Sequence, residues 1–203
     1  MIRQMEYRDL EAVVSVHLQC FKGFFLTYLG PRFLHLYYQC VCTDPAGISL
    51  VYTAEDRVVG FVVGSTNPRG FYTRILRRYW FKFAFLSVPA LMRKPSIVRR
   101  LLGALYHPQK NPIGEDVAGL YSIGVSPQTQ GSGVGQKLVK SFIDQVKNTK
   151  CSKIFLTTDR ENNVETNNFY SKIGFIIKRD FRTAEGRYMN EYWLELDDES
   201  CIG

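Results

Sequence analysis

Gln130-Gly131-Ser132-Gly133-Val134-Gly135 lies between an apolar run that predicts a strand, residues 120–125, and a segment that predicts a helix, residues 134–147. Three glycines in alternate positions allow the backbone to approach a ligand closely. A helix that begins here leaves its first N–H groups without intrahelical partners, and its dipole favours negative charge at that end. The stretch therefore predicts a loop that binds phosphate.

Two common nucleotide-binding patterns fail at particular residues of this loop. The dinucleotide pattern G-x-G-x-x-G requires a third glycine where the chain has Gln136. The P-loop pattern also requires glycine at Gln136, and it requires Ser or Thr after Lys137. The loop does fit Q/R-x-x-G-x-G/A, with Gln130, Gly133 and Gly135 at the three fixed positions.

A second segment, residues 163–175, follows the next expected helix and strand and reads N-V-E-T-N-N-F-Y-S-K-I-G-F. Together with the glycine loop it resembles the GCN5-related N-acetyltransferase (GNAT) superfamily. Members of that superfamily carry the loop at the acetyl-CoA site and the form N-x-x-A-x-x-(F/L)-Y-x-K-x-G-F after their fifth strand. Asn163 and Tyr170 have the required spacing, while Thr166 stands where alanine is usual.

The resemblance implies a fold, a donor and a reaction. The expected fold is of the α/β (α+β) class, with a mixed, mostly antiparallel sheet of about seven strands, helices on both faces and a V-shaped splay between strands four and five. The expected donor is acetyl-CoA, with no metal. The expected reaction is direct attack of a primary amine on the thioester in a ternary complex.

The resemblance also assigns donor contacts by position. The backbone of Ile123, Gly124 and Val125 is expected to pair with the pantetheine arm, and Asn163 to bind a pantetheine amide. The pyrophosphate is expected on the helix N-terminus and on the backbone amides of the loop: Gln130, Gly131, Ser132, Gly133, Val134 and Gly135. Further contacts with the cofactor are expected from Gln136, Phe169 and Lys172. Asn163 is equally suited to capping the next helix, and Lys172 to lying in solvent.

The resemblance implies that the Tyr170 hydroxyl lies near the thioester sulfur. Tyr170 is therefore the expected general acid, because a phenol with an ordinary pKa of ~10 is protonated at neutral pH and can donate to a thiolate. The alternative is an aromatic side chain that packs under the cofactor. No motif fixes the general base. Asp159, as base or orienting group, and Tyr121 are the favoured residues, from a set near the expected fourth and fifth strands: Glu115, Asp116, Tyr121, Ser122 and Asp159.

Composition agrees with one enzyme domain over residues 1–203. The chain has 45% hydrophobic residues, enough for a sizeable core. Its five cysteines are odd in number and lack C-x-x-C spacing, which argues against a disulfide framework or a zinc site. The first residues become charged at once, unlike a signal peptide, so a cytoplasmic location is expected.

The remaining pattern alternates between strands and helices. We expect a strand at residues 2–5, a helix capped by Asp9 that ends at Cys20, and a second helix opened by Gly30-Pro31. Hairpins are expected at residues 48–64 and 175–196, and a buried strand at residues 153–158. His17, His35 and His107 belong to no motif and are expected to be packing or surface residues.

Residues 67–114 form a basic, aromatic-rich insertion with ten of the chain's 26 basic residues and none of its 19 acidic ones. Its apolar run, residues 80–92, is interrupted by Lys82 and Pro89 and is shorter than the ~20 residues needed to span a bilayer. The simplest interpretation is a helix pair with aromatics on the sheet and arginines in water. The alternatives are contact with a substrate phosphate or with an anionic membrane surface.

The acceptor is the least determined part of the function. Aromatic residues crowd the first two expected helices, where the superfamily shapes its acceptor side: Phe21, Phe24, Phe25, Tyr28, Phe33, Tyr37 and Tyr38. Such walls suit sugar faces and apolar substrates, but they also suit a core, which is the safer interpretation at helical spacing. The leading hypothesis is a small amine such as an amino sugar or nucleotide amino sugar. The alternatives are a protein or peptide amine and a non-catalytic acyl-CoA sensor. Nucleic acid is not an expected partner, and a homodimer is compatible.

Overall fold

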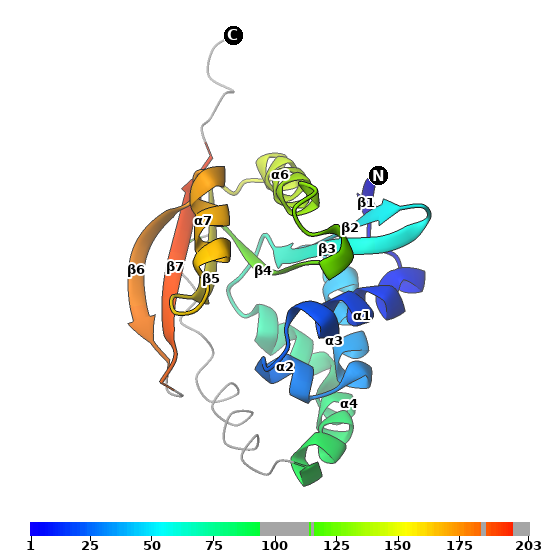
Figure 1. Cartoon of the computed structure of the whole chain (residues 1–203). Helices are drawn as coiled ribbons and strands as arrows, with labels where there is room; N and C mark the ends of the chain where they lie inside the picture. Colours follow the sequence, from blue (N-terminus) through cyan, green and yellow to red (C-terminus); the bar gives the residue numbers. More distant parts are fainter. Residues whose placement is uncertain (94–113, 115, 184–185, 197–203) are drawn as a thin grey trace.

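Seven strands form one mixed sheet in the computed structural model, which describes residues 1–93, 114, 116–183 and 186–196 (Figure 1). The order across the sheet is β1-β2-β3-β4-β5-β7-β6, and β4 and β5 are the parallel pair. This confirms the expected fold class. The strands are β1 (Ile2–Gln4), β2 (Gly47–Ala54), β3 (Arg57–Ser65), β4 (Val117–Val125), β5 (Lys153–Asp159), β6 (Ile176–Arg182) and β7 (Tyr188–Glu195).

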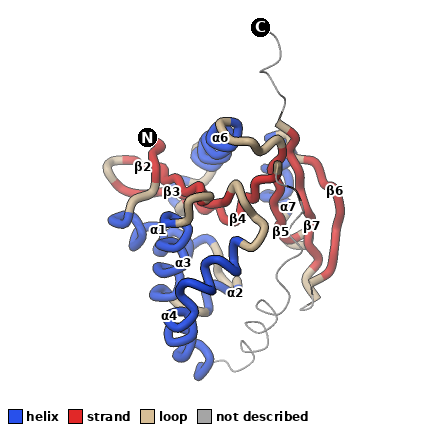
Figure 2. Tube along the Cα trace, turned by 180° about the vertical axis from the view of Figure 1, so that it is seen from behind, coloured by secondary structure: helices blue, strands red, loops and turns tan. Residues whose placement is uncertain are grey.

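Helices cover both faces of the sheet (Figure 2). Alternate side chains of β3 enter different cores: Phe61 and Val63 pack with α1, α3 and α4, whereas Val62 packs with α6 and α7. The helices are η1 (Tyr7–Asp9), α1 (Leu10–Cys20), α2 (Phe25–Tyr28), α3 (Pro31–Thr43), α4 (Phe71–Arg93), η2 (Pro127–Thr129), α6 (Val134–Lys147) and α7 (Val164–Ile173).

The splay between β4 and β5 has a visible local cause. The two strands pair over only three residues each, from Val117 to Gly119 in β4, although both continue well beyond that point. Opposite β3, Val63 pairs with Ser122 and Gly64 pairs with Leu120, so Tyr121 is an extra residue in β4. Such a β-bulge bends the strand that carries it. The bend lets β4 diverge from β5.

The prediction that the Asp9 side chain caps α1 is wrong. Asp9 precedes the helix but makes no side-chain capping bond to it. Its carboxylate binds the Arg3 guanidinium in two places, at 2.6 and 2.7 Å, and accepts a bond from the Glu6 amide at 2.8 Å. A charged partner on β1 holds the carboxylate more strongly than a neutral amide would.

The described part of the insertion also differs from its expectation. Helix α4 is interrupted at Tyr79, so it comprises two helical segments. Phe71 and Phe83 are buried as expected, but Phe81 and Phe85 are 70% and 76% exposed. No helix in the described part of the chain is both long and apolar enough to cross a membrane. Glu115, His107, Cys201 and residues 94–113 lie outside the described residues.

Close packing at Gly64 holds β3, β4 and α6 together. A Cβ atom there would lie 2.2 Å from the Gly119 carbonyl oxygen and 2.6 Å from the Phe142 ring. Neither contact is possible without movement of a strand or of α6. The absence of a side chain at Gly64 is therefore a condition for this packing.

We expect Gly64→Ala to lower the free energy of unfolding by about 3 kcal/mol, because overpacking at this site displaces backbone. Urea denaturation measures the change. Gly70→Ala is the control, because no atom lies within 4 Å of a Cβ added at Gly70, so the substitution meets only the strain of a positive φ (+69°). It should cost only about 1 kcal/mol. Equal losses would contradict the packing argument.

Candidate active site

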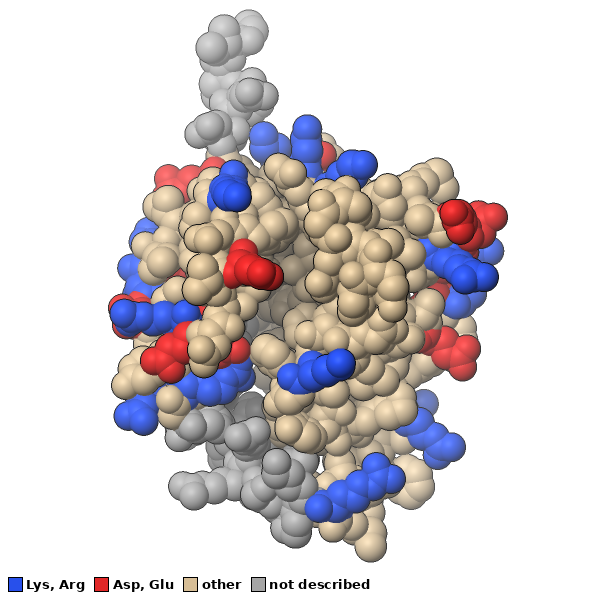
Figure 3. Space-filling view, in the orientation of Figure 1, with Lys and Arg blue, Asp and Glu red and all other residues tan. Residues whose placement is uncertain are grey.

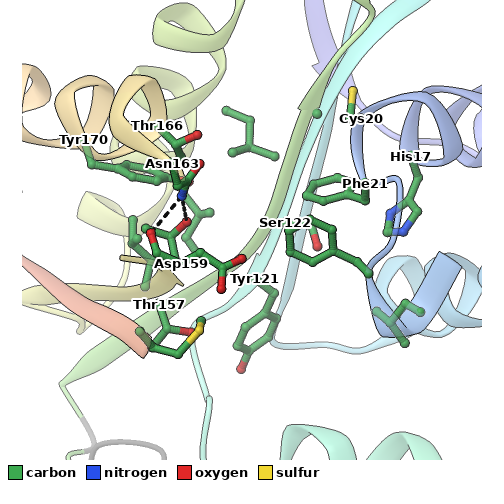
Figure 4. Close-up of a pocket in the computed structure, with 18 of the residues that line it drawn as sticks. His17, Cys20, Phe21, Tyr121, Ser122, Thr157, Asp159, Asn163, Thr166 and Tyr170 are labelled. Carbon is green, nitrogen blue, oxygen red and sulfur yellow. Dashed lines mark hydrogen bonds between the residues drawn. The ribbon is translucent and has the colours of Figure 1, made fainter. Parts of the chain in front are cut away.

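A cavity of about 460 Å³ lies where β4 and β5 diverge. One wall comes from β5, α7 and β7, and the other from α1 and the segment that leads to α2. Figure 4 shows the two walls, with Tyr170 and Asn163 opposite His17 and Phe21. In Figure 3 the surface is hollowed between α7 and α6 and carries few charged side chains there.

The glycine loop leads into α6 at one end of this splay. Gly131 and Gly133 both have φ of +80°, and no atom lies within 4 Å of a Cβ added to either. Gly133 is the residue before α6, and no side chain caps the helix there. The first amides of α6 are thus available to an anion, as helix N-termini generally are.

The other predicted donor contacts divide into those at the cavity and those away from it. Ile123, Gly124, Val125, Gln130 and Asn163 all line the cavity. Phe169 lies beside Gly135, where a Cβ atom added to the glycine would lie 3.5 Å from the Phe169 ring. The side chains of Ser132, Gln136 and Lys172 are exposed and do not line the cavity, while Val134 is buried in the core behind it.

The carbonyl oxygen of Val125, at the end of β4, accepts two hydrogen bonds. The Gln130 side-chain amide donates one at 3.1 Å, and the Cys20 thiol donates the other at 3.1 Å. β4 is therefore tied to the glycine loop on one side and to α1 on the other. Burial raises the pKa of the Cys20 thiol, which keeps this donor protonated.

Tyr170 lies on the buried side of α7 and borders the cavity. Its ring packs edge-on against Phe169 and Phe175, with centroids at 5.2 and 5.7 Å. Burial raises the pKa of the Tyr170 hydroxyl above its ordinary value, because a phenolate is poorly solvated there. The side chain combines both predicted properties, an aromatic packed in the core and a protonated hydroxyl.

Asn163 precedes α7, but its side chain does not cap that helix. The amide nitrogen donates instead to the Thr158 hydroxyl at 2.8 Å and to the Asp159 carbonyl at 3.0 Å (Figure 4). Asn167, one turn later, donates to the same carbonyl at 2.9 Å and accepts bonds from Asn190 and Tyr192. Motif reasoning did not single out Asn167, which joins α7 to β5 and β7.

Asp159 lies at the end of β5 and is committed to an ion pair. Both of its oxygens accept bonds from the Arg187 guanidinium, at 2.6 and 2.9 Å. Arg187 in turn lies over the Phe24 ring, with 5.2 Å between the guanidinium carbon and the ring centroid. The pair thus connects the two walls of the cavity. A carboxylate bound in this bidentate way is a better orienting group than a base.

The bulge places Tyr121 and Ser122 on the same side of the sheet. Tyr121 packs against Phe71 and Tyr72, with ring centroids at 4.7 and 5.6 Å. Burial raises the pKa of its hydroxyl, so Tyr121 is a proton donor rather than a base at neutral pH. Asp116 does not line the cavity and binds Ser152 at 2.8 Å.

His17 is the cavity residue that sequence reasoning missed. It is 2% exposed, on the buried side of α1, yet it borders the cavity. Its Nδ1 atom lies 2.6 Å from the Tyr38 hydroxyl, and its Nε2 atom has no hydrogen-bond partner among the described residues. Burial lowers its pKa to about 4, so the imidazole is neutral at pH 7. No local motif marks His17, because its neighbours Tyr38 and Phe61 come from α3 and β3.

Comparison with known proteins gives a consistent result. The acetyltransferase (GNAT) family model matches residues 10–175. A search of the curated proteins found no match.

Among solved structures, the ribosomal-protein-S18-alanine N-acetyltransferase of Escherichia coli is 15% identical, with a TM-score of 0.61 over 100% of this chain and 99% of that one. An aminoglycoside 6'-acetyltransferase type Ii is 14% identical, with a TM-score of 0.62 over 96% of each chain. A streptothricin acetyltransferase from Bacillus anthracis, described as putative and solved with acetyl coenzyme A, is 18% identical, with a TM-score of 0.52 over 79% of this chain and 68% of that one. At these identities the likeness shows the fold.

His17 makes stability depend on pH. Its pKa is lower in the folded chain, about 4, than the ordinary 6.5, so between these values the unfolded chain binds a proton that the folded chain does not. The stabilisation is present above pH 6.5 and is lost as the pH falls towards 4. We expect the free energy of unfolding to fall by on the order of 2 kcal/mol from about pH 7.5 to about pH 5.

Urea denaturation at the two pH values measures this loss. His17→Phe should reduce it, while His35→Asn, on α3 outside the cavity, should retain it. An unchanged loss in His17→Phe would assign the effect to other groups.

Proposed function

The chain belongs to the acetyltransferase (GNAT) family, and on this premise we propose that it transfers an acetyl group from acetyl-CoA to the primary amine of a small molecule, such as an amino sugar. The reaction we propose is direct attack in a ternary complex. The observation that carries the proposal is the cavity between β4 and β5, which joins the glycine loop at one end to Tyr170 and an aromatic wall at the other.

Acetyl-CoA supplies an activated thioester, and the proposal assigns its binding to the glycine loop and β4. The amides from Gln130 to Gly135 and the start of α6 would hold the pyrophosphate, because the N-terminus of α6 has no side-chain cap and carries partial positive charge. The backbone of Ile123, Gly124 and Val125 would hold the pantetheine arm. Its β5-facing edge is free of strand pairing, since the ladder stops at Gly119. Asn163 and Phe169 would add further contacts with acetyl-CoA.

Exposed side chains provide the outer contacts in this proposal. Ser132 and Gln136 lie at the start of α6, and Lys172 lies near the end of α7, all three at the surface. These positions suit charged or polar contacts with the phosphate end of the donor. They are secondary to the backbone amides, because exposed contacts are screened by solvent.

Tyr170 would act as the general acid. Its hydroxyl borders the cavity and stays protonated at neutral pH, so its Oη atom holds a proton for the departing thiolate sulfur. Asp159 would orient the acceptor side through Arg187 rather than remove a proton, because both of its oxygens are already bound. Tyr121 would shape the floor of the cavity beside the bulge. A water chain to bulk solvent then remains as the route for the amine proton.

The acceptor wall favours an uncharged, partly apolar substrate face. Phe21, Phe24 and Phe25 line it, and aromatic rings suit the face of a sugar ring. None of the described basic residues of α4 lines the cavity. A contact between the insertion and a substrate phosphate therefore has no support from the described residues. An aminoglycoside acetyltransferase among the similar structures is compatible with a sugar amine.

A protein or peptide amine is the second candidate acceptor. The similar ribosomal-protein-S18-alanine N-acetyltransferase shows that the same fold can serve such a substrate. A cytoplasmic location and a homodimer stay predictions in either case.

We expect Tyr170→Phe to lower kcat about 100-fold and leave the Kd for acetyl-CoA within about threefold, because only the proton donor is lost. Steady-state thiol release and calorimetry measure the two quantities. Tyr192→Phe is the matched control: its ring lies 5.9 Å from Tyr170, but its hydroxyl bonds Asn167 and does not line the cavity. That variant should keep kcat within about threefold. An unchanged kcat in Tyr170→Phe would remove the general-acid role.

The acceptor class is tested by a thiol-release screen over amino sugars, nucleotide amino sugars, polyamines, amino acids and peptides. We expect the highest kcat/KM with an amino sugar. A preference for peptides would select the second candidate. Binding of acetyl-CoA without thiol release from any amine would contradict the proposed small-amine activity.

A further inference from the structure

One polar atom on the acceptor wall is buried without a partner. His17 Nε2 has no hydrogen bond within the described part of the chain, and the residue is only 2% exposed. A buried polar group that forms no hydrogen bond costs folding free energy, so such groups are rare and usually have a partner in the functional state. His17 is one of the residues that line the cavity.

The imidazole is held rigidly, as recognition requires. Its Nδ1 atom lies 2.6 Å from the Tyr38 hydroxyl, and Tyr38 also lies beside Ser122 on β4. The ring packs against Phe21 at 4.6 Å between centroids and is stacked with Phe61 at 6.5 Å. These contacts come from α1, α3, β3 and β4 and fix the direction of Nε2. A fixed polar atom loses little entropy when it binds a ligand.

The chemistry of the site selects the group that binds. A neutral imidazole offers at Nε2 either an N–H donor or a lone pair, depending on the tautomer. A hydroxyl group matches both states, because it donates and accepts. Phe21, Phe24 and Phe25 beside it give apolar surface, and in this region a bare cation would lose solvation without gaining a carboxylate partner.

We propose that His17 is a specificity residue that binds a hydroxyl group of the acceptor through Nε2, so that the acceptor is a hydroxylated ring amine. The inference rests on the proposed acetyltransferase activity and narrows its substrate class. Tyr38 acts through His17 as a positioning residue. The aromatic rings of the same wall pack against the apolar faces of the acceptor ring.

The test compares how substitutions at His17 affect acceptors with and without hydroxyl groups. D-Glucosamine, D-galactosamine and kanamycin are the hydroxylated acceptors, and cyclohexylamine is the acceptor without hydroxyls. Wild type and variant are compared on each amine separately, so the different basicities of the amines cancel. We expect His17→Phe to raise KM about tenfold for the best hydroxylated acceptor, to change its kcat less than threefold, and to leave cyclohexylamine unaffected.

Two conservative variants separate the two ring nitrogens. His17→Asn retains a polar atom near the position of Nδ1, facing Tyr38, and should show the raised KM. His17→Gln carries its amide near the position of Nε2 and should restore KM to within about threefold of wild type. His35→Asn is the control on α3 and should behave as wild type. The midpoint of thermal unfolding and the Kd for acetyl-CoA establish that each variant is folded.

A measurement on the unsubstituted protein covers the case in which the variants do not fold. The ¹⁵N resonance of His17 Nε2 should shift on addition of the best hydroxylated acceptor together with coenzyme A, and should not shift with cyclohexylamine. No shift, or an equal rise in KM for both classes of amine, would overturn the role of His17. The role of His17 would also be overturned if the protein acetylates peptides or polyamines but none of the three hydroxylated probes. In that case the acetyltransferase activity itself would still be supported. Absence of thiol release with every amine would instead reject the proposed function.

Discussion

The short ladder between β4 and β5 is the constraint on which the site depends. Only three residue pairs join the two strands, because the extra residue Tyr121 bends β4 away from its neighbour. One edge of the β4 backbone beyond Gly119 is therefore free of strand pairing, and the opening becomes the cavity. The same bulge brings both Tyr121 and Ser122 to the side of α1 and α3. The bulge thus accounts both for the cavity and for the position of Ser122 on the side of α1 and α3.

The two walls of the cavity are built differently, and the charged groups of Asp159 and Arg187 already bind each other. On one wall Asn167 links α7 to β5 and β7 and holds the turn that carries Asn163. On the other, α1 presents aromatic rings and a buried imidazole. The bidentate pair of Asp159 and Arg187, with Arg187 over Phe24, bridges the walls. Because the carboxylate and guanidinium satisfy each other, the groups left for substrate are neutral, and they include the hydroxyls of Tyr170 and Tyr121 and the imidazole of His17.

The donor side could be predicted from the chain because its parts are local in sequence. A phosphate loop needs consecutive amides and small residues, so the spacing of Gln130, Gly133 and Gly135 is visible in the chain. The structure provides the φ of +80° at Gly133 and the uncapped start of α6. The capping role expected for Asp9 failed, because its partner Arg3 is charged and lies on another element. The exposure of Phe81 and Phe85 was not foreseen either, since periodicity alone does not say which side of α4 meets the core.

By itself the sequence determined the family, the position of the glycine loop and the order of strands and helices, since these depend on short-range spacing and periodicity. Only the tertiary structure decided which side chains meet across the cavity. It assigned Asp159 to Arg187, brought Tyr38 to His17 and left the Nε2 atom of His17 without a partner within the described residues. These relations join residues far apart in the chain, and their free energies depend on burial and on which partner is nearest. A pattern along one dimension does not contain that information.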